Sequence, residues 1–121
     1  MTQNNLGNAL SDQGNRTEGP KGAALLVEAV TAYRGTLEVT TRADHPVDWA
    51  ITQDNIAIAL LGRAARADTE DPATDLQAAL AAVDGALEVF KPQHMSYHHS
   101  GATRLRERIL ADLAALKDGG T

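Results

Sequence analysis

The sequence contains no cysteine among its 121 residues. Disulfide bonds, cysteine-based zinc sites and a cysteine nucleophile are therefore excluded. No apolar run approaches the roughly eighteen residues that a membrane-spanning helix needs. The N-terminal segment is polar and lacks the apolar central region of a secretory signal peptide. These absences lead us to expect a soluble, cytoplasmic protein that does not contact a membrane.

Aromatic side chains are also scarce, at 3% of the sequence, whereas 43% of the residues are hydrophobic, mostly Ala, Leu, Val and Ile. A core so rich in alanine implies helices that approach closely rather than the thick layers of a β-sandwich. No segment alternates apolar and polar residues for long, so β-structure is not expected. The net charge of −5 argues against a nucleic-acid-binding protein, because such binding depends on Lys and Arg neutralising phosphates.

Catalytic signatures are missing as well. The sequence has no glycine-rich phosphate loop after a predicted strand and no H-E-x-x-H metalloprotease motif. Arg104, Arg106 and Arg108 form a small basic cluster, but Glu107 interrupts it. We therefore expect a protein that is not an enzyme and has no cofactor.

What the sequence does have is a repeat at an offset of fifty residues. MTQNNLGNAL at 1–10 returns as ITQDNIAIAL at 51–60, and fourteen of the first thirty-nine positions are identical without a gap. Self-similarity at a fixed period is typical of stacked repeats, in which each unit buries its apolar face against its neighbours. The sequence thus predicts one domain (1–121) made of a first repeat at 1–50, a second at 51–100 and a terminal helix at 101–118.

Five segments carry helical periodicity between turn-forming stretches, so we expect an all-α protein of about five antiparallel helices. Four of the predicted helices cover roughly 1–13, 22–42, 47–67 and 72–90, and the fifth runs to about 117 and is clearest from Ala102. Pro46 and Pro72 suit the first position of a helix, and Asp71 suits the N-cap before Pro72. The first helix is predicted to bury a face of Leu6, Ala9, Leu10 and Gln13. The second is predicted to bury a stripe of Leu26, Ala29, Val30, Tyr33 and Leu37.

These helices carry the pattern of a known repeat. The tetratricopeptide repeat is a helical hairpin with L-G-x2-Y in its first helix and A-x3-F-x2-A in its second. The chain resembles it through Leu6-Gly7-x2-Leu10 with Ala29-x3-Tyr33-x2-Thr36, and again through Ile56-Ala57-x2-Leu60 with Ala79-x3-Val83-x2-Ala86.

The segment 37–60, LEVTTRADHPVDWAITQDNIAIAL, is most similar to the long subclass of kinesin light chains and bacterial signalling arrays. In that subclass, L-E-x-x…D-H-P-x-x-A-x-T-x-x-N-L-A joins one unit to the next. The unit of fifty residues departs from the usual thirty-four or so, and Trp49 stands seven residues before Ile56 instead of three. The resemblance implies an α-solenoid that serves as a protein–protein interaction module.

The resemblance also implies a site. The first helix of each hairpin lines a concave groove, which in similar proteins binds an extended peptide or a partner protein. A spacing of four residues places Arg104 and Arg108 on one helical face, where they could hold a carboxylate, and an ordinary solvated face is the alternative. Asn5 and Asn55 recur beside Leu6 and Ile56, and we expect them to bond backbone at the hairpin interface. The predicted groove residues are Asn4, Asn8, Asp54, Ile58, Arg104 and Arg108.

Three histidines raise the possibility of a metal site. If their segment is helical, His94 and His98 lie four residues apart on one face, as in a two-point ligand pair for zinc or nickel. No third ligand is evident, so we expect His94, His98 and His99 to form an exposed cluster that binds no metal.

An alternative function is self-association. The chain opens at the residue equivalent to Ile51, so the first unit lacks the counterpart of PVDWA at 46–50. The second helix would then expose more apolar surface than a short first helix covers, and such patches tend to mark interfaces. We therefore expect a homodimer through the first two helices, and the alternative function is a structural assembly unit, or a fragment of a longer array, without a separate ligand. The apolar residues concerned are Leu25, Leu26, Val30, Tyr33 and Leu37.

Overall fold

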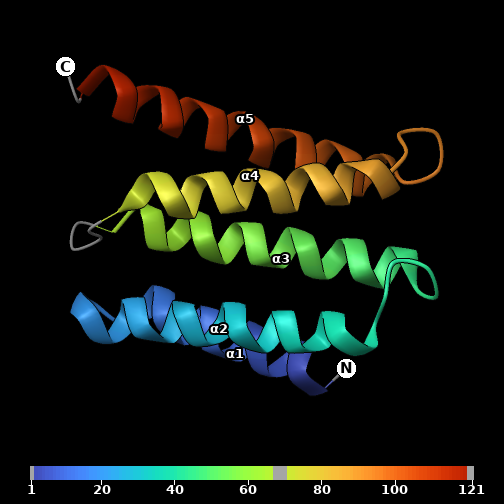
Figure 1. Cartoon of the computed structure of the whole chain (residues 1–121), viewed down its shortest axis with the longest axis horizontal. Coiled ribbons are helices and arrows are strands. Elements are labelled where there is room, and N and C mark those ends of the chain that lie inside the picture. The colour runs from blue at the N-terminus through green and yellow to red at the C-terminus, as the bar shows by residue number, and fades with distance from the viewer. Residues whose placement is uncertain (1, 67–70, 120–121) are drawn as a thin grey trace.

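The computed structural model describes residues 2–66 and 71–119, with side chains for 5–66 and 71–117. All regular structure in these ranges is α-helical, which confirms the all-α prediction with five helices. Consecutive helices are antiparallel and follow one another in chain order across the molecule (Figure 1). None of the described helices is long and apolar enough to cross a membrane. The helices are α1 (Thr2–Arg16), α2 (Gly19–Val39), α3 (Pro46–Ala64), α4 (Pro72–Val89) and α5 (Ser96–Gly119).

Two of the helix starts follow directly from the sequence. Pro46 and Pro72 stand at the beginning of α3 and α4, where the missing N–H of proline is not needed. The Asp71 carboxylate caps α4 by accepting hydrogen bonds from the Thr74 backbone N–H (3.2 Å) and the Thr74 hydroxyl (2.6 Å). These two hydrogen bonds lower the pKa of Asp71. The predicted N-cap is confirmed.

The turn between α1 and α2 is shorter than predicted. The stretch 14–22 was expected to be a loop, but α1 continues to Arg16 and α2 begins at Gly19. Pro20 fits the first turn of α2, and Gly19 adopts the left-handed conformation (φ 77°) that the tight connection requires.

Arg66, just beyond α3, holds this turn in place. Its guanidinium donates hydrogen bonds to the backbone carbonyls of Thr17 (2.6 Å), Gly19 (2.9 Å) and Gly14 (3.2 Å). Gly22 lies against the same turn, and a Cβ at this position would overlap the Thr17 carbonyl and the Arg66 guanidinium. The Arg66 side chain, which follows α3, is therefore part of the α1–α2 connection.

The turns after α2 and after α4 have the same backbone geometry fifty residues apart. The helices end at Val39 and Val89, and the next ones begin at Pro46 and Ser96. Ser96 replaces the proline here, so the sequence pattern of the fifth helix is clear only from Ala102, six residues after the start of α5. The matching hydrogen bonds are Thr40 N–H to Thr36 O (2.8 Å) and Phe90 N–H to Ala86 O (2.9 Å), His45 N–H to Thr41 O and Met95 N–H to Lys91 O (both 2.8 Å), and Trp49 N–H to His45 O (2.9 Å) and His99 N–H to Met95 O (2.8 Å).

The core lies mainly between α2, α3 and α4. The predicted stripe of α2 is confirmed for its first four residues, which are buried, and Leu37 is partly buried against them. Ala29 and Ala79, fifty residues apart, are both fully buried, which lets the helices on either side come close. The largest fully buried side chains are Phe90, Leu26, Leu76, Ile109 and Val83.

The predicted face of α1 is wrong at three of its four residues, and the fourth, Leu10, is half-buried against the core. Gly7, Ser11 and Gly14 are buried, whereas Leu6 is 52% exposed and Ala9 and Gln13 are exposed. The reason is close packing: a Cβ on Gly7 would lie 2.5 Å from the ring of Tyr33 on α2. Helix α1 therefore turns its small residues toward α2, because only these leave room for the large side chains that α2 presents.

Candidate functional site

A groove runs between α2 and α4, with α3 as its floor. It consists of two adjoining cavities of about 310 and 220 Å³ that share Arg34 and Ala78. Along α3 the groove extends from Gln53 to Arg63, a length of about 15 Å at 1.5 Å per helical residue. Cavities of this size, near the lower end of the range for ligand pockets, accommodate a few side chains of a partner.

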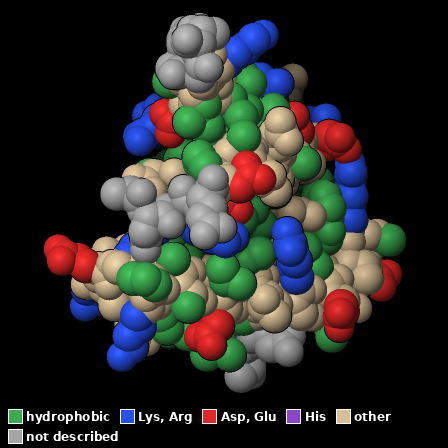
Figure 2. All heavy atoms as spheres, turned by 60° about the vertical axis from the view of Figure 1, so that its left-hand side comes forward, with side chains coloured by type: hydrophobic (Ala, Val, Ile, Leu, Met, Phe, Trp, Pro, Cys, Tyr) green, Lys and Arg blue, Asp and Glu red, His purple; other side chains and the backbone are tan. Residues whose placement is uncertain are grey.

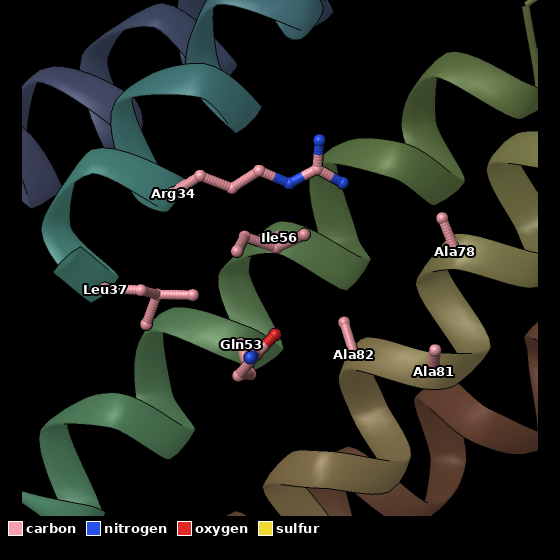
Figure 3. A pocket seen from close by; sticks show the side chains of 7 residues that line it. All are labelled: Arg34, Leu37, Gln53, Ile56, Ala78, Ala81 and Ala82. Carbon is pink, nitrogen blue, oxygen red and sulfur yellow. The ribbon is translucent and has the colours of Figure 1, made fainter. Parts of the chain in front are cut away.

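The two walls of the groove differ in character. The α4 wall carries only methyl groups over the larger cavity, from Ala78, Ala81 and Ala82, and these face the groove in Figure 3. The centre of the floor is apolar, with Ile56 and Leu60 buried in the core, and the polar Gln53 and Arg63 stand at its two ends. The α2 wall contributes the larger side chains, Val27, Val30, Thr31, Arg34 and Leu37.

Arg34 is the exposed cation of this groove. Its side chain extends from α2 over α3 (Figure 3). Within residues 5–66 and 71–117, the Arg34 guanidinium forms no hydrogen bond or ion pair, and Glu38, one helical turn further along, does not pair with it. A guanidinium with five donors thus lies over an apolar floor without an anion of the described chain.

The other charges in the groove compensate each other. Arg63 Nη1 lies 3.1 Å from Asp75 Oδ1, and the Asp75 side chain is only 9% exposed. The pKa of Asp75 is raised, mainly because the carboxyl group is buried. The nearby Arg63 opposes this rise, and Asp71 adds to it. The second carboxylate oxygen of Asp75 is buried without a hydrogen-bond partner in the described structure. Arg34 is therefore the lining residue whose charge is not balanced within the groove.

The residues predicted for a concave groove lie elsewhere, on α1, α3 and α5. The side chain of Asn4 lies outside the described residues. The amide oxygen of Asn8 accepts a hydrogen bond from the Tyr33 hydroxyl (2.6 Å). Arg108 Nε donates to both carboxylate oxygens of Asp112 on the same helix (3.2 Å each). Two of the predicted ligand-binding groups are thus already bound within the chain.

The remaining three predicted residues are spread over α3 and α5. Ile58 is 46% exposed and Arg104 is exposed. One carboxylate oxygen of Asp54 is buried without a partner among the described residues. The pKa of Asp54 is raised because the carboxyl group is buried, and His98 of α5 offsets part of this rise. The structure therefore brings Asp54 near His98, at the start of α5.

The two recurring asparagines do not play the predicted role. Asn5 is exposed and Asn55 is half-buried. Neither side chain forms a hydrogen bond with any part of the chain that the structure describes. Because Asn5 and its neighbour Leu6 both face solvent, the Asn5 side chain does not reach the backbone at the hairpin interface.

The histidines of the metal hypothesis lie around the start of α5. His94 lies in the turn before the helix, and His98 packs its ring 5.0 Å from Phe90 and 5.7 Å from Tyr97. Among the described residues, no group of three or more His, Asp or Glu side chains could hold a metal ion. At the opposite end of the molecule, which carries the α1–α2 turn, Figure 2 shows basic and acidic side chains interspersed and no histidine.

The surface that suggested a homodimer is largely covered within one chain. Leu26, Val30 and Tyr33 are buried, and Leu25 and Leu37 are half-buried. The glycines of α1 let this short helix approach α2 closely enough to cover it. The homodimer stays a prediction, now without this apolar patch as its basis.

The buried Tyr33 provides a pH-dependent prediction. Burial, together with the nearby Asp12 carboxylate, raises the pKa of Tyr33 to about 12. The unfolded chain ionises this phenol near its ordinary pKa of about 10, so the stabilisation is complete below pH 10 and is lost as the pH rises toward 12. We expect the free energy of unfolding to fall by roughly 2–3 kcal/mol over this range, measured by urea unfolding. The Tyr33→Phe variant should lack this part of the decline, and an equal decline in both proteins would contradict the assignment.

Two features of the sequence correspond to the groove, although neither belongs to the repeat motif. The run AALAAVDGA at 78–86 supplies small residues on successive turns of α4. Position 34 is arginine whereas position 84, fifty residues later, is aspartate, so the repeat changes the sign of its charge at this point.

Comparison with protein-family models, with curated proteins and with solved structures finds no match for this chain. The similarity to tetratricopeptide repeats stays a prediction.

Proposed function

We propose that this protein is an interaction module that holds a helical segment of a partner protein in the groove between α2 and α4. The observation that carries the proposal is the groove itself, with its apolar floor, its methyl-lined α4 wall and the Arg34 guanidinium above it. A concave site that combines apolar side chains with a few polar groups is the usual form of a binding site.

A helix fits this groove better than an extended peptide does. The groove is lined by the sides of three helices, whose backbone groups bond within each helix. An extended peptide would need partners for its own backbone N–H and C=O groups, and the larger cavity offers only Arg34 and Gln53 as polar side chains. A helix satisfies its own backbone and presents side chains to a groove at three- and four-residue spacing. The groove is long enough for nearly three helical turns of about 5.4 Å each.

The alternative location, across α1, α3 and α5, receives less support. There, Asn8 and Arg108 would have to leave Tyr33 and Asp112 before they could bind a ligand. The groove between α2 and α4 needs no such exchange at Arg34. We therefore place the interaction in this groove, as a binding function without catalysis.

Filling the groove tests this function. Ala81 is exposed and lines the larger cavity, so Ala81→Phe places a ring in the groove without disturbing the core. Binders are first selected from a displayed library of helix-forming peptides against the wild-type protein. We expect Ala81→Phe to weaken their affinity at least tenfold, measured by fluorescence anisotropy.

The matched control is Ala111→Phe, which makes the same change at an exposed alanine of α5 outside the groove. It should leave the affinity within about twofold, and circular dichroism should show unchanged helicity for both variants. Equal affinities of Ala81→Phe and wild type would place the binding site elsewhere.

A further inference from the structure

We infer that the partner helix carries a carboxylate that pairs with Arg34, flanked by apolar side chains that pack over Ile56. This inference rests on the proposed function and specifies the chemistry of the partner. It follows from the comparison of two equivalent places in the same chain and from the charges of the groove.

In the second half of the chain, the position equivalent to Arg34 forms an ion pair. Fifty residues after Arg34 and Ile56 stand Asp84 on α4 and Arg106 on α5. Arg106 Nε lies 2.6 Å from Asp84 Oδ1, so the equivalent helix pair is bridged by an ion pair within the chain. In the first half, the α3 position holds isoleucine instead of a charged group. Arg34 therefore lacks the counter-ion that its equivalent position has.

The charged residues of the groove determine which sign of charge the partner segment should carry. Its described charged residues are Arg34, Arg63 and Asp75, and the last two form an ion pair. The local excess is one positive charge, whereas the whole chain has a net charge of −5. Long-range attraction would favour a basic partner, so selection of an acidic one would have to come from the groove. A guanidinium binds a carboxylate through two parallel N–H···O bonds, which also fixes orientation.

The neighbouring floor defines what flanks the carboxylate. Ile56 and Leu37 line the same cavity as Arg34, and Leu60 lines the next one along α3. Side chains three and four positions apart lie on one face of a helix. The partner segment is therefore a helix with Asp or Glu at one position and apolar residues three and four positions away.

The test is a comparison of selections. The displayed library of helix-forming peptides is panned separately against wild type and against Arg34→Glu. We expect wild type to enrich acidic residues flanked by apolar ones, and Arg34→Glu to enrich Lys or Arg at the same position. Acidic peptides selected on wild type should bind Arg34→Gln and Arg34→Glu at least tenfold more weakly. Arg16→Glu, which makes the same charge change at an exposed arginine of α1, should bind them as wild type does.

A thiol reports whether the peptides occupy the groove. The natural sequence has no cysteine, so Ala81→Cys introduces a unique reactive group at the α4 wall, and its rate of maleimide labelling is measured. We expect the selected acidic peptides to slow the labelling. Peptides that slow the labelling but show no acidic preference, or bind Arg34→Glu equally well, would overturn the inference and leave the proposed function intact.

Peptides that bind without slowing the labelling, or a library that yields no binder, would overturn the proposed function and this inference with it. A second copy of the chain is the competing occupant. If light scattering shows a dimer for wild type and a 12.8 kDa monomer for Arg34→Glu, the groove binds another copy, and the separate acidic partner is excluded.

Discussion

Replacing Arg66 with methionine is expected to lower the free energy of unfolding by about 3–4 kcal/mol, since an unmet buried polar group costs about 1–3 kcal/mol. The guanidinium bonds three carbonyls of the α1–α2 turn, at Gly14, Thr17 and Gly19. Methionine preserves much of the apolar stem but donates nothing, so these partly buried carbonyls lose their partner. Urea unfolding followed by circular dichroism measures the change.

Arg16 supplies the matched control, because it occupies the equivalent position fifty residues earlier. It is exposed at the end of α1, so Arg16→Met should change the stability by no more than about 0.5 kcal/mol. Arg66→Lys should lie between the two, since an ammonium cannot reach three carbonyls in the planar arrangement of a guanidinium. Equal effects of Arg66→Met and Arg16→Met would show that the turn does not depend on Arg66.

The parts of the fold that the sequence predicted are those set by local chemistry. Pro46 and Pro72 mark helix starts wherever they stand, and Asp71 caps a helix through its own neighbour Thr74. The α2 stripe could be predicted because its large apolar residues recur at helical spacing. Each of these features depends on contacts within a few residues.

The sequence-based predictions were wrong where a residue distant in the sequence determines the local structure. Periodicity favoured Leu6 as the inward residue of α1, but the ring of Tyr33 leaves room only for the glycine at position 7. The stretch 14–22 has the composition of a loop, yet Arg66, which is far away in the sequence, stabilises it as a tight turn. Local patterns carry no information about such partners.

The candidate groove was not predicted for the same reason. Its walls, α2 and α4, are not consecutive in the sequence, and only the position of α3 between them creates the cavities. That Asn8 is bound by Tyr33, and that Arg34 has no anion among the described residues, depends on tertiary placement. The fifty-residue offset nevertheless makes the difference interpretable, because the pair Asp84–Arg106 shows what position 34 lacks.

The second large effect is expected at Phe90, where α4 passes into the turn before α5. Its side chain is 1% exposed, and its ring lies 5.0 Å from that of His98 on α5. We expect Phe90→Ala to cost about 3–5 kcal/mol of unfolding free energy, because truncating a buried phenylalanine loses its transfer free energy and leaves a cavity. That is a large fraction of the 5–15 kcal/mol or so that stabilises a typical domain.

Tyr97→Ala is the control for this position. Tyr97 also contacts the His98 ring, but it is 83% exposed, so its truncation should cost at most about 0.5 kcal/mol. The two variants therefore separate burial from aromatic contact, since both remove a ring that touches His98. Urea unfolding of both proteins decides between them: a similar small cost for each would mean that α5 does not depend on Phe90 for its attachment to α4. A large loss in Phe90→Ala alone would place the main α4–α5 anchor at a position whose equivalent fifty residues earlier, between α2 and α3, is only Thr40.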